Sequence, residues 1–343
     1  MIESWFIDNL ACPIDHQSLR ADGEGLVCGE GHRYPIVDGV PIMLRPDVRQ
    51  TIALADASLR RARSQEQDVR APGLYLESLG ISDAEKEGVI SLAAANTAID
   101  PVVAYLVAAT NGLTYKHLVG QLKEYPIPDL PLPHGRSKRL LDVGCSWGRW
   151  TLAAHAKGYE SVGIDPSLGA VMAARRVARQ LGAPNRYLVA DARYLPFPPQ
   201  SFDVTYSYSV LQHMSASDVA LAVGEMGRVL INGGHAKVQM PTKFGVRCLY
   251  HQARRAFRSA RGFEVRYWTI PNLVQLFERH VGAASVEVDC YFGIGLQRAD
   301  EPVMTPPLKR VLRASERLKA ASRSWSPLVW AADSVFVEAT ARA

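Results

Sequence analysis

The sequence has few cysteines and no long apolar run, and both absences narrow the class of protein. Its five cysteines are odd in number and scattered along 343 residues, so a disulfide framework is not expected. No apolar run approaches the roughly 18–20 residues that span a bilayer, and the N-terminus lacks the basic head and apolar core of a signal peptide. We therefore expect a cytoplasmic protein without a membrane span.

The sequence also lacks a large excess of either sign of charge. The 39 basic and 34 acidic residues leave a net charge of +5, which permits an anionic partner without requiring one. Low-complexity runs are absent and 48% of the residues are apolar, as in a folded globular protein. The length suggests two domains, or one domain with a sizeable appendage, and it leaves the oligomeric state open.

Two short cysteine-bearing motifs lie near the N-terminus. Cys12 is followed by Asp15, Cys28 is followed by His32, and short strands are predicted at residues 26–27 and 36–44. This spacing is typical of a small zinc ribbon, and thiolate, imidazole and carboxylate groups all ligate zinc. The candidate metal ligands are Cys12, Cys28, His32 and Asp15 or His16. The alternative is a ribbon that has lost its metal and is stabilised by its strands alone.

The run YPIVDGVP at residues 34–41 strengthens the ribbon interpretation. It resembles the zinc-ribbon-like activator proteins of tRNA methyltransferases. The segment is also similar to the N-terminal zinc module of certain rRNA guanine methyltransferases, whose ligands are Cys-x2-Cys and Cys-x3-His. Asp15 stands where that pattern has its second cysteine. We assign residues 1–46 to a zinc-ribbon-like, β-rich module.

Residues 47–136 are predicted to form a helical region and a strap that cover the pocket of the following domain. Residues 48–67 are rich in Ala, Leu and Arg, and Ser82 and Glu85 have the spacing of a capping box. A proline-rich stretch at residues 125–133 is expected to be extended, because proline restricts φ. Tyr115 and His117 are candidate substrate contacts; the alternative is that they are ordinary packing or surface residues.

The most informative stretch is residues 139–150, RLLDVGCSWGRW. An apolar run ends in Asp142 and is followed by two glycines, Gly144 and Gly148, before an amphipathic segment. This is the layout of a buried strand, a tight turn and a helix, and glycine lets a ligand approach bare backbone. A dinucleotide site would need a second glycine where Ser146 stands, so a pyrophosphate site is not indicated.

Acidic residues follow three successive predicted strands. Asp142, Asp165 and Asp191 each stand at or just after a strand end. S-adenosylmethionine has no phosphate but carries an amino group, a ribose diol and an adenine amine, all of which carboxylates or their neighbours can recognise. Three such acids in order, beside a glycine turn, favour this cofactor.

Strands and helices alternate through residues 137–343, which predicts a doubly wound, mostly parallel seven-stranded α/β sheet covered on both faces. The glycines of Asn232-Gly233-Gly234 are expected to turn the chain into the fifth strand. Strands are predicted at residues 139–143, 161–165, 187–191, 201–209, 235–240, 284–291 and 333–339, and helices at 168–181, 217–230 and 271–278.

Residues 139–240 resemble the class I S-adenosylmethionine-dependent methyltransferases, which have a Rossmann-like fold, and particularly bacterial small-molecule enzymes related to the quinone-biosynthesis C-methylases. LDVGCSWG at 141–148, VGIDPS at 162–167 and ADA at 190–192 match their motifs. The resemblance implies that Asp165 holds the ribose hydroxyls, Asp191 the adenine amine and the glycine turn the methionine moiety. The predicted cofactor contacts are Asp142, Gly144, Cys145, Ser146, Trp147, Gly148, Asp165, Pro166, Asp191, Ala192 and Ser207.

The residues that bind the methyl acceptor are expected just past the fourth strand and in a basic, aromatic insertion at residues 243–268. His213 is the candidate base, because the ordinary pKa of histidine, about 6.5, suits proton abstraction near neutrality; the alternative is a residue that caps the turn or lines the pocket. An arginine-rich cover suits an anionic acceptor, although a solvated helix face is equally consistent. The remaining candidate substrate contacts are Tyr208, Gln239, Arg247 and His251.

Three functions remain open at this point. The first is a methyltransferase acting on a small molecule or glycan precursor, with O-methylation of an anionic acceptor. The second is an RNA methyltransferase that uses the ribbon module to bind RNA, for which the net charge is small. The third is a non-catalytic, cofactor-binding activator subunit, against which the three strand-end acids argue.

Overall fold

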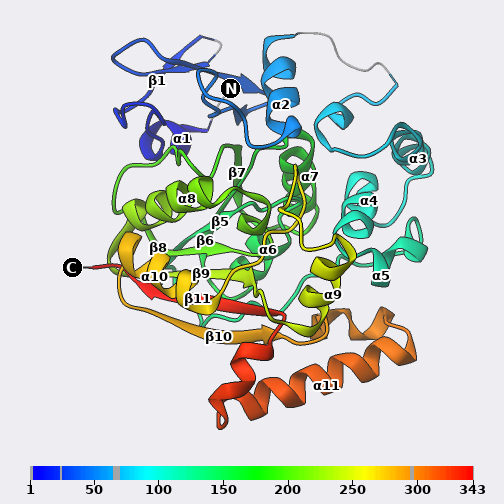
Figure 1. Cartoon of the computed structure of the whole chain (residues 1–343). Helices are drawn as coiled ribbons and strands as arrows, with labels where there is room; N and C mark the ends of the chain where they lie inside the picture. The colour runs from blue at the N-terminus through cyan, green and yellow to red at the C-terminus, as the bar shows by residue number, and fades with distance from the viewer. Residues whose placement is uncertain (1–2, 24, 65–69, 294–296, 343) are drawn as a thin grey trace. The chain divides into compact units, whose positions relative to one another are not determined.

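The computed structural model describes residues 3–23, 25–64, 70–293 and 297–342. The chain divides into two compact units, Met1–Ser201 and Phe202–Ala343. The boundaries predicted near residues 46 and 136 both fall inside the first unit, and they stay a prediction. Figure 1 shows the order of the elements along the chain.

The N-terminal module is a short helix, which was not predicted, followed by the small β-rich sheet that the sequence predicts. The sheet has the strand order β1-β2-β3-β4, and Leu26 pairs with Ala21 on one side and Tyr34 on the other. Leu26 and Tyr34 are buried, so this small sheet has an apolar centre. Its elements are α1 (Ser4–Asn9), β1 (Arg20–Asp22), β2 (Gly25–Val27), β3 (Arg33–Val37) and β4 (Val40–Pro41).

A helical region follows, as predicted. Its capping box is present: Ser82 Oγ accepts a hydrogen bond from the Glu85 amide, and the Glu85 carboxylate accepts one from the Ser82 amide. The helix predicted at 48–67 is shorter, and its last predicted residues lie outside the described ones. The elements are α2 (Ala53–Arg63), η1 (Leu76–Ser78), α3 (Asp83–Ala94), α4 (Pro101–Thr110), α5 (Gly112–Tyr115) and η2 (Lys116–Leu118).

The proline-rich strap at residues 125–133 contains neither helix nor strand and is bonded to the side chains of Lys157 and Tyr159. Lys157 Nζ donates to the Leu132 carbonyl over 3.2 Å, and Tyr159 Oη donates to the Pro133 carbonyl over 2.9 Å. These side chains satisfy strap carbonyls that have no strand partner. The strap is not fully extended, because the Leu132 amide donates to the Leu130 carbonyl and closes a tight turn.

The large sheet is seven-stranded, mixed and mostly parallel, with the strand order β10-β11-β9-β8-β5-β6-β7. Strand β5 pairs with β6, and β6 with β7, in parallel. Alternation with helices produces this arrangement, because parallel neighbours require a crossover between them. Within the first unit the elements are β5 (Arg139–Val143), α6 (Arg149–Ala156), β6 (Glu160–Asp165), α7 (Leu168–Gln180) and β7 (Arg186–Val189).

The second unit holds the other four strands. Strand β8 pairs with β9 in parallel, whereas β11 is antiparallel to both β9 and β10. Its main elements are β8 (Phe202–Ser207), η3 (Leu211–His213), α8 (Ala216–Val229), β9 (Leu230–Pro241), α9 (Val246–Arg254), α10 (Ile270–His280), β10 (Ala284–Cys290), α11 (Pro306–Ser322) and β11 (Ser334–Thr340), with η4 (Arg298–Val303) and η5 (Ser326–Ala331) on either side of α11.

The turn predicted at residues 232–234 proves to be an irregularity inside β9. Leu230 pairs with Phe202, but the next pair is His235 with Val204, so four residues of β9 stand opposite one of β8. Gly233 has φ of 73°, which relieves the backbone at this bulge. The strand is longer than predicted because pairing resumes in the same sheet after the bulge.

The N-terminal module is attached to β7 and the loop after it. Ile42 forms a parallel bridge with Val189, and the Met43 amide donates to the Val189 carbonyl over 2.7 Å. The Ala11 amide donates to the Pro196 carbonyl over 2.9 Å. The module thus supplies hydrogen bonds to the outermost strand of the sheet, whose polar groups would otherwise be unpaired.

The helical region is tied to the loop that connects β6 with α7. Ser58 Oγ accepts from the Leu168 amide over 2.9 Å and lies 2.7 Å from the Pro166 carbonyl, to which it donates. Ser167 Oγ likewise donates to the Ser78 carbonyl over 2.6 Å. Ser58 and Ser78 are fully buried, so these bonds fix a loop that begins next to Asp165.

None of the helices built from the described residues is both long and apolar enough to cross a membrane.

The Ser58→Ala variant tests this connection. The substitution leaves the buried Leu168 amide without its acceptor, so the free energy of unfolding should fall by about 1–3 kcal/mol. The exposed Ser91, whose hydroxyl donates to the Glu87 carbonyl, provides the matched control, and Ser91→Ala should change stability by no more than about 0.5 kcal/mol. Urea unfolding of both variants measures the difference. Equal losses would show that the Ser58 contacts do not stabilise the loop.

Candidate functional site

The glycine turn between β5 and α6 has three residues with positive φ. Gly144, Ser146 and Gly148 have φ of 84°, 49° and 83°. The amides of Gly144 and Cys145 both donate to the Ile164 carbonyl over 2.8 Å, which ties the turn to β6. A strand, a left-handed turn and a helix start therefore follow one another as predicted.

Gly148 must be glycine for a steric reason as well. A Cβ at this position would lie 2.6 Å from Tyr187 Oη, and Tyr187 is itself buried in β7. The ring cannot move away without disturbing the core. The turn is therefore held close to the sheet, with bare backbone where the chain enters α6.

Asp165 lies at the end of β6 and is bonded to both neighbouring loops. The Ser146 amide donates to Asp165 Oδ2 over 3.0 Å, and the Ser167 amide donates to Oδ1 over 2.9 Å. Burial raises the pKa of Asp165 to about 6, and these two amides only partly oppose the rise. Each carboxylate oxygen accepts one backbone bond and has a further lone pair for a ligand.

Asp142 lies deeper than Asp165. It is 1% exposed, and Thr151 Oγ1 of α6 donates to its Oδ2 over 2.6 Å. Burial raises the pKa of Asp142 to about 7; the Thr151 bond opposes this and the nearby charge of Asp165 adds to it. The bond fastens α6 to β5, and the cofactor contact stays a prediction.

Asp191 is paired with a residue that sequence reasoning missed. The Arg193 guanidinium donates to both carboxylate oxygens, over 2.8 Å from Nη2 to Oδ2 and 3.2 Å from Nε to Oδ1. Both side chains are buried, and Arg193 Nη2 also donates to the Arg49 carbonyl over 2.8 Å. An adenine amine would thus share Asp191 with Arg193. The only sequence signal is an arginine two residues after the acid.

The other predicted cofactor contacts are spread over the glycine turn, the residues after the two acids and the end of β8. Cys145 and Trp147 are buried, and Trp147 packs against Tyr125 of the strap with ring centroids 6.0 Å apart. Pro166 and Ala192 follow the two acids directly. Ser207 is the last residue of β8, in the second unit, and is fully buried.

His213 lies in η3 and is bound on both ring nitrogens. Nδ1 lies 2.7 Å from the Phe263 carbonyl, which can only accept, and Nε2 lies 3.2 Å from Gln212 Nε2, which can only donate. The ring stacks on Phe263 with centroids 3.9 Å apart. Burial lowers the pKa of His213, so the imidazole is neutral at pH 7. Its role as a base stays a prediction, since Gln212 occupies the unprotonated nitrogen.

Tyr208 follows the last residue of β8, and Gln239 lies near the end of β9. The Ser209 amide donates to Gln239 Oε1 over 3.0 Å, while Gln239 Nε2 is buried and has no hydrogen-bond partner among the described residues. Tyr208 Oη lies 3.2 Å from Asp289 Oδ2, and Gln297 Nε2 donates to Tyr208 Oη over 2.6 Å. A buried donor without a partner is a position where a ligand oxygen could bind.

Asp289 was not foreseen, because it comes from a strand 81 residues after Tyr208. It is buried near the end of β10, and Ser334 Oγ donates to its Oδ2 over 2.7 Å. Burial raises the pKa of Asp289 above its ordinary value, and the Ser334 and Tyr208 bonds oppose the rise. In the sequence it is an unremarkable acid within an apolar run.

Arg247 and His251 are neighbours on α9. Arg247 Nε donates to His251 Nε2 over 3.4 Å, and burial together with the Arg247 charge lowers the pKa of His251. Of the two candidates in the first unit, Tyr115 is 1% exposed at the end of α5, whereas His117 is exposed in η2. Tyr115 and His117 therefore differ in exposure to solvent, and the substrate role of each stays a prediction.

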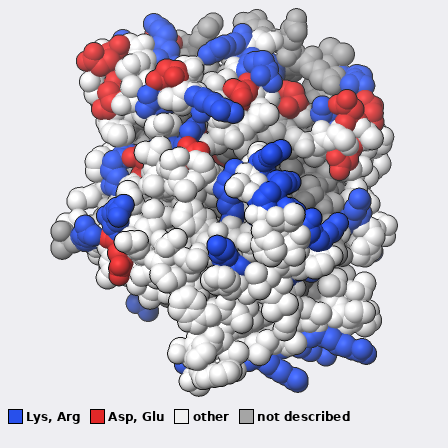
Figure 2. All heavy atoms as spheres, in the orientation of Figure 1, with Lys and Arg blue, Asp and Glu red and all other residues white. Residues whose placement is uncertain are grey.

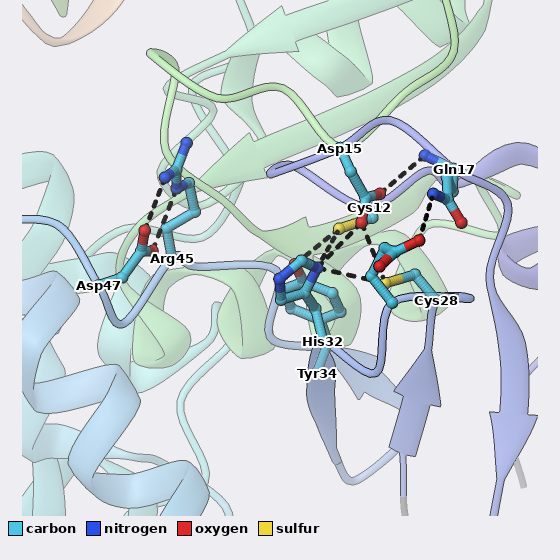
Figure 3. A network of polar contacts seen from close by, with 9 residues as sticks. Cys12, Asp15, Gln17, Cys28, His32, Tyr34, Arg45 and Asp47 are labelled. Atoms are coloured by element: carbon cyan, nitrogen blue, oxygen red, sulfur yellow. Dashed lines mark hydrogen bonds and ion pairs between the residues drawn. The ribbon is translucent and has the colours of Figure 1, made fainter.

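The four predicted metal ligands converge. Asp15 follows Cys12 in one tight turn, and His32 follows Cys28 in another. One donor atom from each of these residues lies within 4.8 Å of every other. His32 Nδ1 is 3.0 Å from Asp15 Oδ2, 3.3 Å from Cys28 Sγ and 3.5 Å from Cys12 Sγ. Figure 3 shows the four side chains pointing toward one another.

These distances fit a tetrahedral ion. Bonds of about 2.3 Å to sulfur and about 2.0–2.2 Å to nitrogen and oxygen place the donor atoms roughly 3.3–3.8 Å apart. The three separations from His32 Nδ1 lie within or just below this range, and no pair is wider than 4.8 Å, so small movements of the side chains would admit zinc. Tyr34 Oη, 3.1 Å from Cys12 Sγ, provides a further hydrogen bond to one ligand.

Two parts of the chain are similar to known proteins. Residues 141–238 match the family described as "Methyltransferase domain". Over 104 residues the chain is 38% identical to a demethylmenaquinone methyltransferase of Thermus thermophilus, which covers 29% of this chain and 46% of that protein. Over 96 residues it is 29% identical to a ubiquinone biosynthesis O-methyltransferase of Azorhizobium caulinodans, covering 28% of this chain and 37% of that protein.

A different relative matches the ribbon module. A UPF0434 protein of Teredinibacter turnerae is 40% identical over 53 residues, which are 15% of this chain and 83% of that protein. Among solved structures, the YcgJ protein of Bacillus subtilis is similar with a TM-score of 0.43 and 19% identity, covering 62% of this chain and 94% of that one. The chain spans less than half the length of the methyltransferase relatives that it matches.

Residues 141–238 therefore form a class I S-adenosylmethionine-dependent methyltransferase domain. Through its N-terminal region the chain also belongs to the UPF0434 family. Both resemblances predicted from the sequence are confirmed.

The buried acid Asp142 makes stability depend on pH. Its pKa of about 7 in the folded chain exceeds the value of 3.8 for an unperturbed carboxyl, so the folded state holds this proton more tightly. Its contribution is complete below about pH 4 and is lost as the pH rises through 7. Asp142→Asn should therefore flatten the fall in unfolding free energy between about pH 5 and about pH 8.

Urea midpoints at both pH values measure this effect. Asp56→Asn is the control, because Asp56 is exposed on α2 and its variant should follow the wild-type profile. A profile for Asp142→Asn as steep as that of the wild type would contradict the assignment.

Proposed function

We propose that this protein transfers a methyl group from S-adenosylmethionine to a small molecule or glycan precursor, with O-methylation of an anionic acceptor. The observation that carries the proposal is the hydrogen bond between the glycine turn and Asp165. Each carboxylate oxygen of Asp165 accepts one backbone hydrogen bond and can accept another from a ligand that lies against the turn. The match of residues 141–238 to a methyltransferase domain supports it.

The cofactor contacts are proposed within the first unit. Asp165 would accept hydrogen bonds from the ribose hydroxyls, for which each oxygen has a lone pair in addition to its backbone bond. Asp191 would hold the adenine amine, while the two hydrogen bonds from Arg193 keep that carboxylate in a fixed orientation. The backbone of residues 144–148 would lie against the methionine moiety. When bound, S-adenosylmethionine supplies an electrophilic methyl group on sulfur.

The acceptor contacts are proposed within the second unit. Gln239 Nε2 is a buried donor without a partner among the described residues, and an acceptor oxygen would satisfy it. Tyr208 is held by Gln297 and Asp289, so its hydroxyl is fixed in position. Arg247, which lies beside His251 on α9, favours an anionic acceptor. The Azorhizobium relative is a ubiquinone biosynthesis O-methyltransferase, which supports oxygen as the methylated atom.

Proton removal is assigned to His213. Its neutral ring meets the first requirement of a base near pH 7. Its Nε2 becomes available only if Gln212 changes its hydrogen bond, so acceptor binding would have to displace that amide. Because the sulfonium is already a strong electrophile, alignment of the acceptor is proposed to contribute more than proton transfer.

An RNA methyltransferase is the second candidate. The ribbon module is similar to a UPF0434 protein, and RNA binding would be one use for such a module. The net charge of +5 over 343 residues provides little general attraction for a polyanion. Salt-sensitive RNA binding would favour this candidate. A non-catalytic cofactor-binding activator is the third, and an absence of transfer to any acceptor despite cofactor binding would favour it.

Zinc is proposed as a structural ion of the ribbon module, held by Cys12, Asp15, Cys28 and His32. With four protein ligands the site would be closed, and such sites contribute to folding rather than to catalysis. The ion would fix the two turns that carry the ligands and thereby the strands that lie between and after them.

Cofactor binding is tested by Asp165→Asn. Loss of the charged acceptor should weaken S-adenosylmethionine binding about 10- to 100-fold by titration calorimetry, because hydrogen bonds to charged groups contribute about 1.5–3 kcal/mol. Asp203→Asn is the matched control, because Asp203 lies near the amino end of β8 rather than at the carboxyl end of a strand. The affinity of this variant for S-adenosylmethionine should be unchanged. Unchanged affinity in Asp165→Asn would contradict the proposed site. Transfer of a labelled methyl group to a panel of anionic and neutral acceptors then tests the substrate class.

Zinc is tested by elemental analysis of the purified chain. About one zinc ion per chain is expected, falling several-fold in Cys28→Ser, together with a lower melting temperature. Cys248→Ser removes a buried thiol outside the cluster and should leave the zinc content unchanged. If wild-type protein prepared with added zinc contains none, the four residues form a hydrogen-bonded polar cluster without a metal.

A further inference from the structure

The second unit has an unusual concentration of exposed apolar side chains. Ten large apolar side chains are exposed among the described residues, and six of them lie between residues 244 and 263. A folded chain normally scatters such side chains singly, so a cluster of this kind indicates an interaction surface. The six are Phe244, Val246, Leu249, Tyr250, Phe257 and Phe263, and we call them the apolar patch.

Contacts on the inner side of α9 fix which of its faces is exposed. Cys248 and Gln252, one turn apart, are buried on the inner side. Cys248 Sγ donates to the Asp333 carbonyl over 3.2 Å, and Gln252 Nε2 donates to the Lys243 carbonyl over 2.8 Å. With these two facing inward, Val246 and Tyr250 necessarily face outward, and they are 56% and 57% exposed.

The patch is surrounded by positive charge. Residues 243–268 contain seven Lys or Arg and a single acid, Glu264, so their net charge of +6 exceeds the +5 of the whole chain. Arg254 lies over the Tyr250 ring at 5.9 Å, and Lys243 over the Phe244 ring at 6.0 Å. Figure 2 shows Lys and Arg side chains gathered over the part of the surface where α9 and the loop after it lie.

The mixture of side chains distinguishes between partners. Aromatic rings and arginines alone would also suit a nucleic acid, whose bases stack on rings. Val246 and Leu249 offer no ring for stacking, and Leu249 is 39% exposed between Arg247 and Tyr250. Aliphatic and aromatic side chains that project outward, within a rim of long basic side chains, match an interface of acyl chains beneath anionic headgroups.

We propose that α9 and the loop through Phe263 form a docking surface for an anionic lipid bilayer. The patch inserts its side chains at the level of the headgroups, while Arg254 and Arg261 bind lipid phosphates. The chain thereby binds to the membrane surface without crossing it. This inference does not depend on the methyl acceptor or on cofactor binding.

Vesicle co-sedimentation of the full chain tests the proposal. Binding is expected to phosphatidylcholine vesicles that contain about 30% phosphatidylglycerol, and it should be several-fold weaker with phosphatidylcholine alone. Raising the salt concentration from about 0.1 M to about 0.5 M should weaken it further, because exposed charges are screened. The double variant Leu249→Glu, Tyr250→Glu should lose at least about tenfold in binding, since it buries charge where apolar side chains insert.

Two controls separate this surface from general effects. Leu221→Glu changes a similarly exposed leucine on α8, at 48% exposure, and should bind vesicles as the wild type does. Arg254→Gln with Arg261→Gln keeps the apolar patch and should reduce only the preference for phosphatidylglycerol. Circular dichroism checks that each variant is folded.

Three results would overturn the proposal. The first is the absence of sedimentation with phosphatidylglycerol vesicles. The second is equal binding by the wild type and the Leu249→Glu, Tyr250→Glu variant. The third is a wild-type chain that does not bind vesicles but binds single-stranded RNA, or forms a dimer in analytical ultracentrifugation, and loses that binding in the Leu249→Glu, Tyr250→Glu variant. The surface would then bind nucleic acid or a second copy of the chain.

Discussion

The structure of the first unit depends on how one half-buried carboxylate is held. Asp165 is bonded by amides from two different loops, that of Ser146 in the glycine turn and that of Ser167 at the start of α7. The second loop is fixed in turn by Ser58 and Ser78 of the helical region. A charge desolvated this strongly is tolerated only where donors surround it. The candidate cofactor site and the helices that precede it are thus parts of one hydrogen-bonded arrangement.

Much of the fold could be predicted because its signals are local. Strand and helix periods, the glycines at residues 144 and 148 and the three acids stand within short windows, and β5, β6 and β7 appear where predicted. The capping box at Ser82 is equally local. The bulge in β9 was missed because its glycines indicate a turn in isolation, whereas pairing with β8 continues beyond them.

The candidate site could be predicted only in part, because several of its contacts join distant residues. Phe263 stacks on His213 across 50 residues, and Asp289 reaches Tyr208 across 81. Nothing in the spacing of a sequence tells which loop folds back onto a given ring. The four ribbon ligands were predictable as a set, since each pair lies within one turn, but their approach to within 4.8 Å depends on the sheet between them.

The bridge between Ile42 and Val189 has a consequence for assembly. A ribbon module supplied as a separate chain would dissociate from β7 on dilution. Here the two bridged residues lie 147 positions apart in the same chain (189 − 42), and tethering of this kind maintains an effective concentration that dilution does not lower. The ribbon thus stays against the outer strand at any concentration of protein, and its presence cannot be regulated independently of the domain that it contacts.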